Sequence, residues 1–161
     1  MDIIRILIYF LAFVILTMAF VFGFLYRIER SKRMGIEKAV EKNLYFANLM
    51  DLWLDNKQHG RELSAWLAER GYTRIAIYGM GVLGKRLLED LFDSVVQVDY
   101  GIDVNADRIN VDVDMLKPMS DLRQVDAVVI TCYEGKDKAI DLLKSKLNCP
   151  VLDIKYIIEK C

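Results

Sequence analysis

The chain has 161 residues, which is enough for one modest domain together with a membrane anchor. Its 22 basic and 23 acidic residues are intermixed and give a net charge of −1, so nothing in the charge favours a nucleic-acid partner, and none is expected. The three cysteines lack the spacing of a metal site, and the single histidine, His59, lies in a turn-like setting. We therefore expect free thiols and no metal.

Residues 6–26 predict a membrane-spanning helix. These 21 residues carry no charge, and a helix of that length measures about 31 Å, which matches the hydrocarbon core of a bilayer. A cleaved signal peptide would have a shorter apolar region followed by a small-residue cleavage site, and a buried core helix of this kind would be unusual in so small a domain. We therefore expect a retained single-pass anchor over residues 1–27.

Basic residues gather on the C-terminal side of the apolar segment. They are Arg27, Arg30, Lys32, Arg33 and Lys38, against Arg5 and the α-amino group on the other side. Because basic flanks stay on the cytoplasmic side of a membrane, the anchor is expected in the cell membrane with the C-terminal domain in the cytoplasm. Free thiols and cytosolic nucleotides as ligands agree with that placement.

Residues 28–71 are expected to form juxtamembrane and prefix helices. Apolar side chains recur at helical spacing along the proline-free segment 27–56. They are Ile36, Val40, Leu44, Ala47, Met50 and Leu54, with Phe46 and Trp53 widening the stripe. Two interpretations stay open, packing on the chain's own domain and a homodimer seam. We favour the first because the repeat spans fewer than three heptads and Asn43 interrupts one register.

A second prefix helix is predicted over residues 61–70. Leu63, Trp66 and Leu67 share one face of it, and Gly71 is typical of a helix C-terminal cap. The two prefix helices are expected to cover part of a sheet.

Residues 75–84 carry the most informative pattern. The run IAIYGMGVLG is a short apolar strand followed by Gly79, Gly81 and Gly84 in the spacing G-x-G-x-x-G. In a dinucleotide-binding βαβ unit the first glycine allows a tight turn, the second lets the backbone approach a pyrophosphate, and the third lets the helix pack close to the sheet. The helix start would then direct backbone N–H groups at phosphate.

An acidic residue completes this pattern. A second strand, residues 96–102, leads to Asp103, nineteen residues after Gly84. A carboxylate at that place accepts hydrogen bonds from ribose hydroxyls and repels a 2′-phosphate, which favours NAD over NADP. The same stretch nearly spells a P-loop from Gly79 to Lys85, but Arg86 stands where a magnesium-binding Ser or Thr is needed.

The remaining elements complete an α/β domain over residues 72–161. Further strands are predicted at 109–113, 125–131 and 150–152, and helices at 82–92, 118–123, 136–147 and 154–160. Right-handed crossovers then give a five-stranded parallel Rossmann-like sheet in the order 3-2-1-4-5. A ligand crevice is expected outside the carboxyl ends of strands one and four. Its predicted lining comprises Gly79, Met80, Gly81, Val82, Leu83, Gly84, Asp103, Thr131, Cys132 and Tyr133.

The part of the chain from about Trp53 onward resembles a known family. The runs GYTRIAIYGMGVLGKRLLEDL, VDYGIDVN and VDAVVIT are similar to small Rossmann-like domains found with bacterial cell-surface polysaccharide and glycosyltransferase machinery. Some of those domains are fused to acyltransferases or nucleotide-sugar dehydratases and bind a nucleotide-sugar or serve as accessory parts. The resemblance implies that Gly79, Gly81, Gly84 and Asp103 contact the ligand, and it implies a membrane-bound glycan-synthesis partner.

These features favour a binding module over an enzyme. The expected function is that of a membrane-anchored cytoplasmic module that holds NAD or a nucleotide-sugar as an accessory or regulatory part of surface polysaccharide biosynthesis. Tyr156 and Lys160 have the Y-x-x-x-K spacing of short-chain dehydrogenases, but those enzymes use a different glycine spacing and continue well beyond this point. The alternatives are a minimal NAD-dependent oxidoreductase or nucleotide-sugar-modifying enzyme, a regulatory domain like those that gate potassium transport, and a scaffold with an empty crevice.

Overall fold

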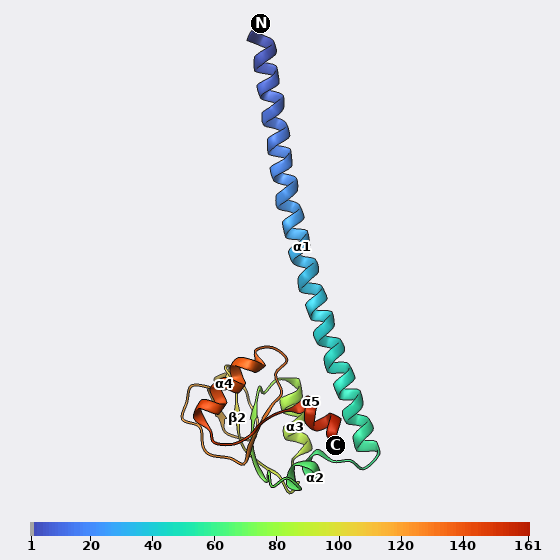
Figure 1. Cartoon of the computed structure of the whole chain (residues 1–161), viewed down its shortest axis with the longest axis vertical. Helices are drawn as coiled ribbons and strands as arrows, with labels where there is room; N and C mark the ends of the chain where they lie inside the picture. The colour runs from blue at the N-terminus through green and yellow to red at the C-terminus, as the bar shows by residue number, and fades with distance from the viewer. Residues whose placement is uncertain (1) are drawn as a thin grey trace. The chain divides into compact units, whose positions relative to one another are not determined.

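The computed structural model describes residues 2–161 and divides into two compact units, one reaching to Phe46 and the other comprising Ala47–Cys161 (Figure 1). Helix α1 runs without a break over Asp2–Gln58. The helices predicted over residues 6–26 and 27–56 are therefore confirmed as parts of one continuous helix.

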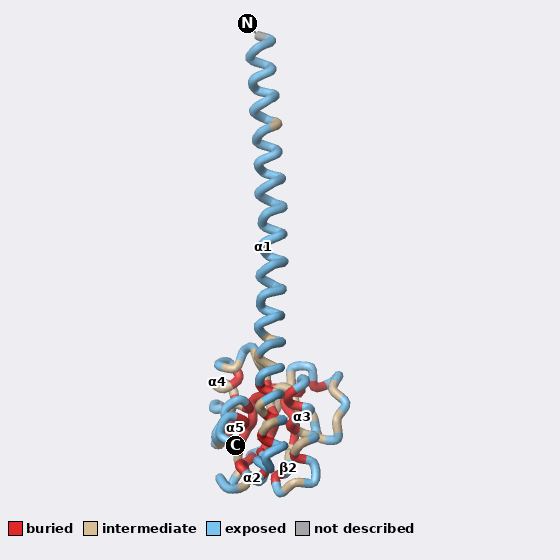
Figure 2. The backbone as a smooth tube through the Cα atoms, turned by 90° about the vertical axis from the view of Figure 1, so that its right-hand side faces the viewer, coloured by how far each residue is buried: buried red, intermediate tan, exposed pale blue. Residues whose placement is uncertain are grey.

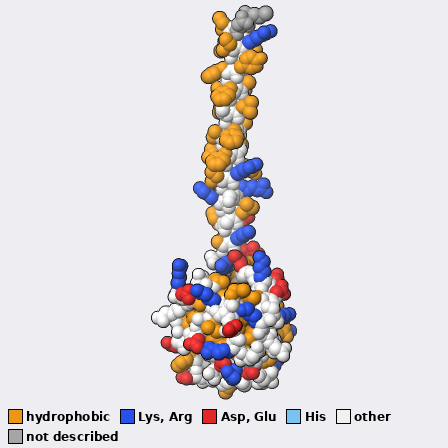
Figure 3. Space-filling model, turned by 90° about the vertical axis from the view of Figure 1, so that its left-hand side faces the viewer, with side chains coloured by type: hydrophobic (Ala, Val, Ile, Leu, Met, Phe, Trp, Pro, Cys, Tyr) orange, Lys and Arg blue, Asp and Glu red, His pale blue; other side chains and the backbone are white. Residues whose placement is uncertain are grey.

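The N-terminal part of α1 has the character of a membrane span. It is the one helix among the described residues that is long and apolar enough, by length and composition, to cross a bilayer. The side chains there are exposed, as Phe20 and Phe22 illustrate with exposed fractions of 77% and 74%. Figure 3 shows apolar side chains covering this part of the helix and Lys and Arg side chains gathering where it ends.

The C-terminal unit is built on an all-parallel sheet of five strands in the order β3-β2-β1-β4-β5. The strands are β1 Arg74–Tyr78, β2 Gln97–Ile102, β3 Met115–Leu116, β4 Ala127–Ile130 and β5 Val151–Asp153. The predicted order 3-2-1-4-5 and the α/β class are confirmed. Strands β1 and β4 lie in the middle of the sheet and bury nearly all of their residues, as a parallel sheet covered on both faces requires.

Helices cover both faces of this sheet. They are α2 Leu63–Ala68, α3 Val82–Asp90, α4 Lys136–Lys146 and α5 Ile154–Lys160, with a 3₁₀ turn η1 at Ala106–Arg108. Helix α4 packs on one face through Ala139 and Leu143, which join Tyr100 and Val128 in a single apolar cluster. Helices α3 and α5 lie on the other side of the sheet (Figure 1). Figure 2 shows that the buried positions concentrate within this unit.

Two predicted elements differ from the structure. The third strand is Met115–Leu116 rather than residues 109–113, because Gly101 and Asp103 of the β2 edge donate to the carbonyls of Asp114 and Leu116. The helix predicted over 118–123 is a turn, closed by a 3.0 Å bond from the N–H of Ser120 to the carbonyl of Lys117. Pro118 occupies the second position of that turn, where its fixed φ is favoured.

The apolar stripe of the prefix also faces differently from the favoured prediction. Within Ala47–Gln58 the buried side chains are Leu49, Trp53 and Asn56, whereas Leu54 is 55% exposed. Trp53, a member of the predicted stripe, packs on the domain as expected, but Leu54 does not, and the buried face also contains Leu49 and the polar Asn56. Hydrophobic periodicity alone cannot find such a face, because an asparagine does not count toward it. Further up the helix Ile36, Val40 and Leu44 are exposed as well.

Candidate functional site

Three central strands end level at one edge of the sheet. The register pairs Tyr78 at the end of β1 with Ile102 of β2 and with Ile130 of β4. The residues that follow, Gly79 and Thr131, continue the pairing: the N–H of Gly79 donates to Ile102 at 2.8 Å, and that of Thr131 donates to Tyr78 at 2.9 Å. The predicted lining residues after β1, β2 and β4 therefore meet at this edge.

Gly79 and Gly84 are required by the backbone itself. Gly79 has a φ of +94°, and a Cβ there would lie 3.1 Å from the backbone nitrogen of Cys132. A Cβ on Gly84 would collide with the carbonyl oxygen of Gly79, since the first turn of α3 packs directly on the glycine turn. Both positions thus have a structural reason for glycine that does not involve a ligand.

Gly81 has no such reason. Its φ of −76° suits any residue, and among the described residues no atom lies within 4 Å of where a Cβ would be placed, its chain neighbours aside. Gly81 is the N-cap of α3, and no side chain of the described chain caps the helix. The space in front of the first N–H groups of α3 is therefore not filled by side chains near Gly81. Free N–H groups at the start of a helix are the groups that bind anions.

Asp103 is held beside this helix start. One of its carboxylate oxygens, Oδ2, accepts a 2.9 Å hydrogen bond from the N–H of Met80, and Oδ1 accepts one of 2.8 Å from the N–H of Asn105. The carboxylate is half-buried. Each carboxylate oxygen has two lone pairs, so each can accept one further hydrogen bond. The acid is therefore fixed in position and can still accept hydrogen bonds from a ligand.

The other residues of the glycine turn differ in what they expose. Met80 and Leu83 are 2% exposed, and the methyl of Met80 packs where Gly101 of β2 leaves room. Val82 is 65% exposed. Met80 and Leu83 thus belong to the core, and of these three side chains only that of Val82 is largely open to solvent.

Thr131 and Cys132 support the turn from β4. Thr131 is 4% exposed, and its hydroxyl donates a hydrogen bond to the carbonyl of Gly79. This bond fixes the glycine turn to the end of β4. Cys132 is half-buried, and this burial raises the pKa of its thiol, an effect that nearby Lys136 partly opposes. The thiol is therefore protonated near neutral pH, unlike an activated cysteine nucleophile.

The same edge contains residues that the sequence analysis did not select. Burial raises the pKa of Tyr78, and the neighbouring Cys132 and Asp103 raise it further. Lys136 at the start of α4 forms a 2.6 Å ion pair with Asp153 at the end of β5, and Asp153 also caps α5 through the N–H of Lys155. The signal for Asp153 was available, since an Asp between an apolar strand and a helix is a typical N-cap.

The Y-x-x-x-K pair belongs to another part of the domain. The ring of Tyr156 is half exposed and packs edge-on against Trp66 of α2, with ring centroids 6.1 Å apart. Lys160 is exposed in the last turn of α5. The contact between Tyr156 and Trp66 therefore packs α5 against α2.

The fold and this edge define a five-stranded parallel α/β domain with a glycine-rich first turn and an acid at the end of the next strand. No family model, curated protein or solved structure matches the chain. A proposal for the function must therefore be based on the geometry of the site.

Proposed function

We propose that the chain is a membrane-anchored nucleotide-binding module whose C-terminal domain holds NAD or a nucleotide-sugar in the cytoplasm. Its role is accessory or regulatory. The ligand class follows from two groups at one edge of the sheet: backbone N–H groups for a diphosphate and a carboxylate for a ribose.

Gly81 is the observation that carries this proposal. The fold explains Gly79 and Gly84, but it leaves Gly81 in an ordinary conformation with open space around it. A glycine without a structural role at an uncapped helix start is accounted for by a ligand that must approach the backbone closely. A pyrophosphate is such a ligand, because it accepts from several N–H groups at once and is stabilised by the positive end of the helix dipole.

Asp103 supplies selectivity among nucleotides. Its bond to the N–H of Met80 keeps the carboxylate beside the turn, where ribose hydroxyls can donate to it. A 2′-phosphate would bring a second negative charge against this carboxylate. We therefore propose that NAD binds in preference to NADP.

The anchor supports the cellular setting of the proposal. The apolar part of α1 is long enough to span a membrane, and basic residues follow it on the C-terminal side. By the positive-inside rule the domain faces the cytoplasm, where nucleotides are available. Together with the resemblance to domains of surface-polysaccharide machinery, this favours a membrane-bound glycan-synthesis assembly as the partner.

The experiment is a ligand panel on the full chain in detergent micelles. NAD, NADP, ADP and UDP-glucose are each added, and the shift in melting temperature is measured. A ligand at 100 times its Kd stabilises the folded state by about 2.7 kcal/mol, which is readily detected. We expect a shift with NAD or UDP-glucose and a smaller one with NADP.

The matched variants are Gly81→Val and Gly35→Val. Both glycines have open space around them, so neither change creates a clash, although Gly81→Val puts a poorer N-cap residue at the start of α3 and should cost about 1 kcal/mol. Gly81→Val places a side chain where the diphosphate would lie and is expected to abolish the ligand shift, whereas Gly35→Val on α1 should retain it. Equal ligand shifts in both variants would refute the proposed site.

A further inference from the structure

The helix that follows the membrane segment has an exposed apolar face. Ile36 is 64% exposed, Val40 is 51% exposed and Leu54 is 55% exposed. Ala47 is also exposed, and Met50 is half-buried. Large apolar side chains repeated along one face of a helix outside the membrane indicate an interaction surface.

This face differs from the one that attaches α1 to its own domain. Leu49, Trp53 and Asn56 are 5%, 4% and 2% exposed, and the side-chain amide of Asn56 donates a 2.7 Å bond to the carbonyl of Ile158 in α5. At about 100° per residue, the middle of this buried face lies roughly 130° around the helix from positions 47, 50 and 54. Within the C-terminal unit this attachment leaves Ala47 and Leu54 exposed, whereas Met50 is half-buried beside α3.

The spacing of the apolar face is that of a coiled-coil seam. Its members alternate at intervals of four and three residues: Ile36, Val40, Asn43, Ala47, Met50 and Leu54. In heptad terms, Val40, Ala47 and Leu54 are a positions, and the other three are d positions. Asn43, at a d position, is the one polar member of the seam.

We propose that the occupant of this seam is a second copy of the chain, forming a parallel, in-register α1 homodimer over residues 32–54. The membrane segment gives both copies the same direction and confines them to one plane, so a parallel pairing is the natural one. This inference does not depend on the ligand site.

Charge complementarity at the flanks of the seam supports this occupant. Lys32 is a g position and Glu37 is the e position five residues later, which is the pair that faces across a parallel coiled coil. By symmetry a dimer contains this pair of opposite charges twice. An antiparallel partner would not bring these two residues together.

The apolar segment of α1 continues the same register. Ala19, three heptads before Val40, is another a position, and Gly23 follows it by four residues. Among the described residues no atom lies within 4 Å of a Cβ placed on Gly23, apart from the helix's own neighbours. Small residues four apart let two membrane helices approach closely.

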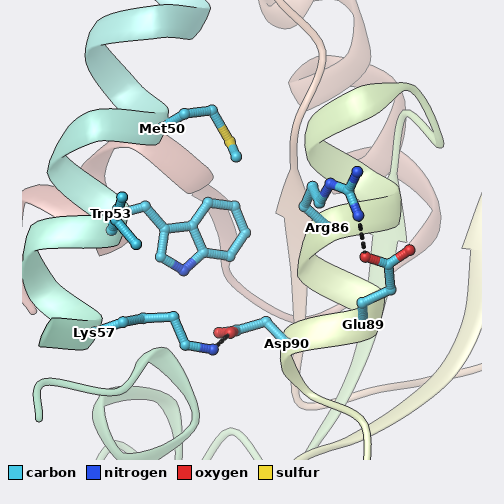
Figure 4. A pocket seen from close by; sticks show the side chains of 7 residues that line it. Met50, Trp53, Lys57, Arg86, Glu89 and Asp90 are labelled. Carbon is cyan, nitrogen blue, oxygen red and sulfur yellow. Dashed lines mark hydrogen bonds and ion pairs between the residues drawn. The ribbon is translucent and has the colours of Figure 1, made fainter.

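The lower end of the seam borders a hollow within the C-terminal unit. Figure 4 shows Met50 and Trp53 of α1 facing Arg86 and Asp90 of α3 across this hollow, whose volume is about 290 Å³. Leu54 also lines it. A second helix lying on the seam would bury the exposed side chain of Leu54.

Cysteine cross-linking of the full chain in membranes tests this proposal. The natural cysteines are first replaced by alanine, and single cysteines are then introduced at Val40 and Ala47 on the seam and at the adjacent Glu41 and Asn48 as matched controls. Disulfides form only when the two Cα atoms lie within about 4.4–6.8 Å of each other, which a positions of a parallel dimer satisfy. All four residues are exposed, so the fold is not at risk.

We expect oxidation to give disulfide-linked dimers at Val40→Cys and Ala47→Cys, several-fold more than at Glu41→Cys and Asn48→Cys. Equal cross-linking at seam and control positions would overturn the proposal, as would its absence from all four. Capture of a different protein at the seam cysteines, without the homodimer, would also overturn it.

A charge exchange tests the register without any cysteine. Lys32→Glu and Glu37→Lys should each weaken dimerisation several-fold in micelles, since each places like charges across the seam. The double variant should restore it, because the pair is then merely reversed. Failure of the double variant to recover would exclude the in-register parallel arrangement.

Discussion

A substitution at Gly84 tests whether α3 packs directly on the glycine turn. Replacing it with alanine would place a Cβ against the carbonyl oxygen of Gly79, which is backbone and cannot rotate away. We expect Gly84→Ala to destabilise the domain by about 1–3 kcal/mol or more, the usual cost of overpacking. Gly81→Ala, with open space around it, is the control in chemical denaturation and should lose only the smaller amount, about 0.5 kcal/mol, that a poorer N-cap residue costs. Equal losses in the two variants would show that the turn is packed differently.

Tyr100 is expected to make the stability of the core depend on pH in the alkaline range. Burial raises the pKa of its phenol from 10.0 to about 12, with Cys149 adding to the effect and Arg123 opposing it. A raised pKa means that the folded state favours the neutral phenol. Its contribution to stability is therefore complete below pH 10.0 and is lost as the pH rises toward about 12.

The corresponding experiment follows the free energy of unfolding from pH 9 to pH 12 in wild type and Tyr100→Phe. The variant loses the hydrogen bond from the phenol to the carbonyl of Arg123 and should be about 1 kcal/mol less stable at neutral pH. Its stability should then fall less steeply than that of wild type above pH 10.0, the ordinary pKa of tyrosine. Parallel pH profiles would contradict the assignment of the alkaline loss to Tyr100.

At the scale of single residues the sequence predicts positions better than orientations. The spacing of Gly79, Gly84 and Asp103 correctly indicated a strand, a turn and an acid after the next strand. It did not indicate that the hydroxyl of Thr131 turns inward to the glycine turn or that Met80 packs into the core. Those orientations depend on what the neighbouring strands place around each side chain, and that information is absent from local spacing.

The last turns of α1 belong to the core of the C-terminal unit. Asn56 joins them to α5 through its bond to the carbonyl of Ile158. We expect Asn56→Ala to cost about 1–3 kcal/mol, since it leaves that carbonyl without this partner in a buried place. Asn48→Ala, an exposed asparagine on the same helix, is the control and should be neutral. The free energy of unfolding of the full chain in micelles measures both.

A neutral Asn56→Ala would mean that this hydrogen bond adds nothing to the attachment of α1, which would then depend on the buried Leu49 and Trp53.

At the scale of elements, the long periodic segments were predictable and the short connections were not. Residues 154–160 form the predicted helix, and β1 and β4 fall within one or two residues of their predicted ends. The predicted third strand was wrong. Residues 109–113 alternate between apolar and polar side chains as a strand does, but the residues that pair with β2 are Met115 and Leu116. Register against a neighbouring strand, rather than composition, selects the paired residues.

The orientation of the whole chain can be tested by labelling. We expect the domain in the cytoplasm, so a membrane-impermeant maleimide should label the half-buried Cys161 only after the cells are made permeable. A cysteine placed at Ile3, on the other side of the apolar segment, should be labelled in intact cells. The reverse pattern would place the domain outside and would remove the cytosolic nucleotides from its reach.

The central claim is that a nucleotide diphosphate lies at the start of α3, and the most direct measurement is nuclear magnetic resonance of the full chain labelled with ¹⁵N at its nine glycines. On addition of NAD or UDP-glucose, the account predicts that the amide signal of Gly81 moves most and that of Gly79 moves with it. The signals of Gly60 and Gly71, which lie in turns outside this edge of the sheet, should stay in place. If neither ligand moves Gly81, or if the glycines of the other turns move instead, the proposed site is contradicted.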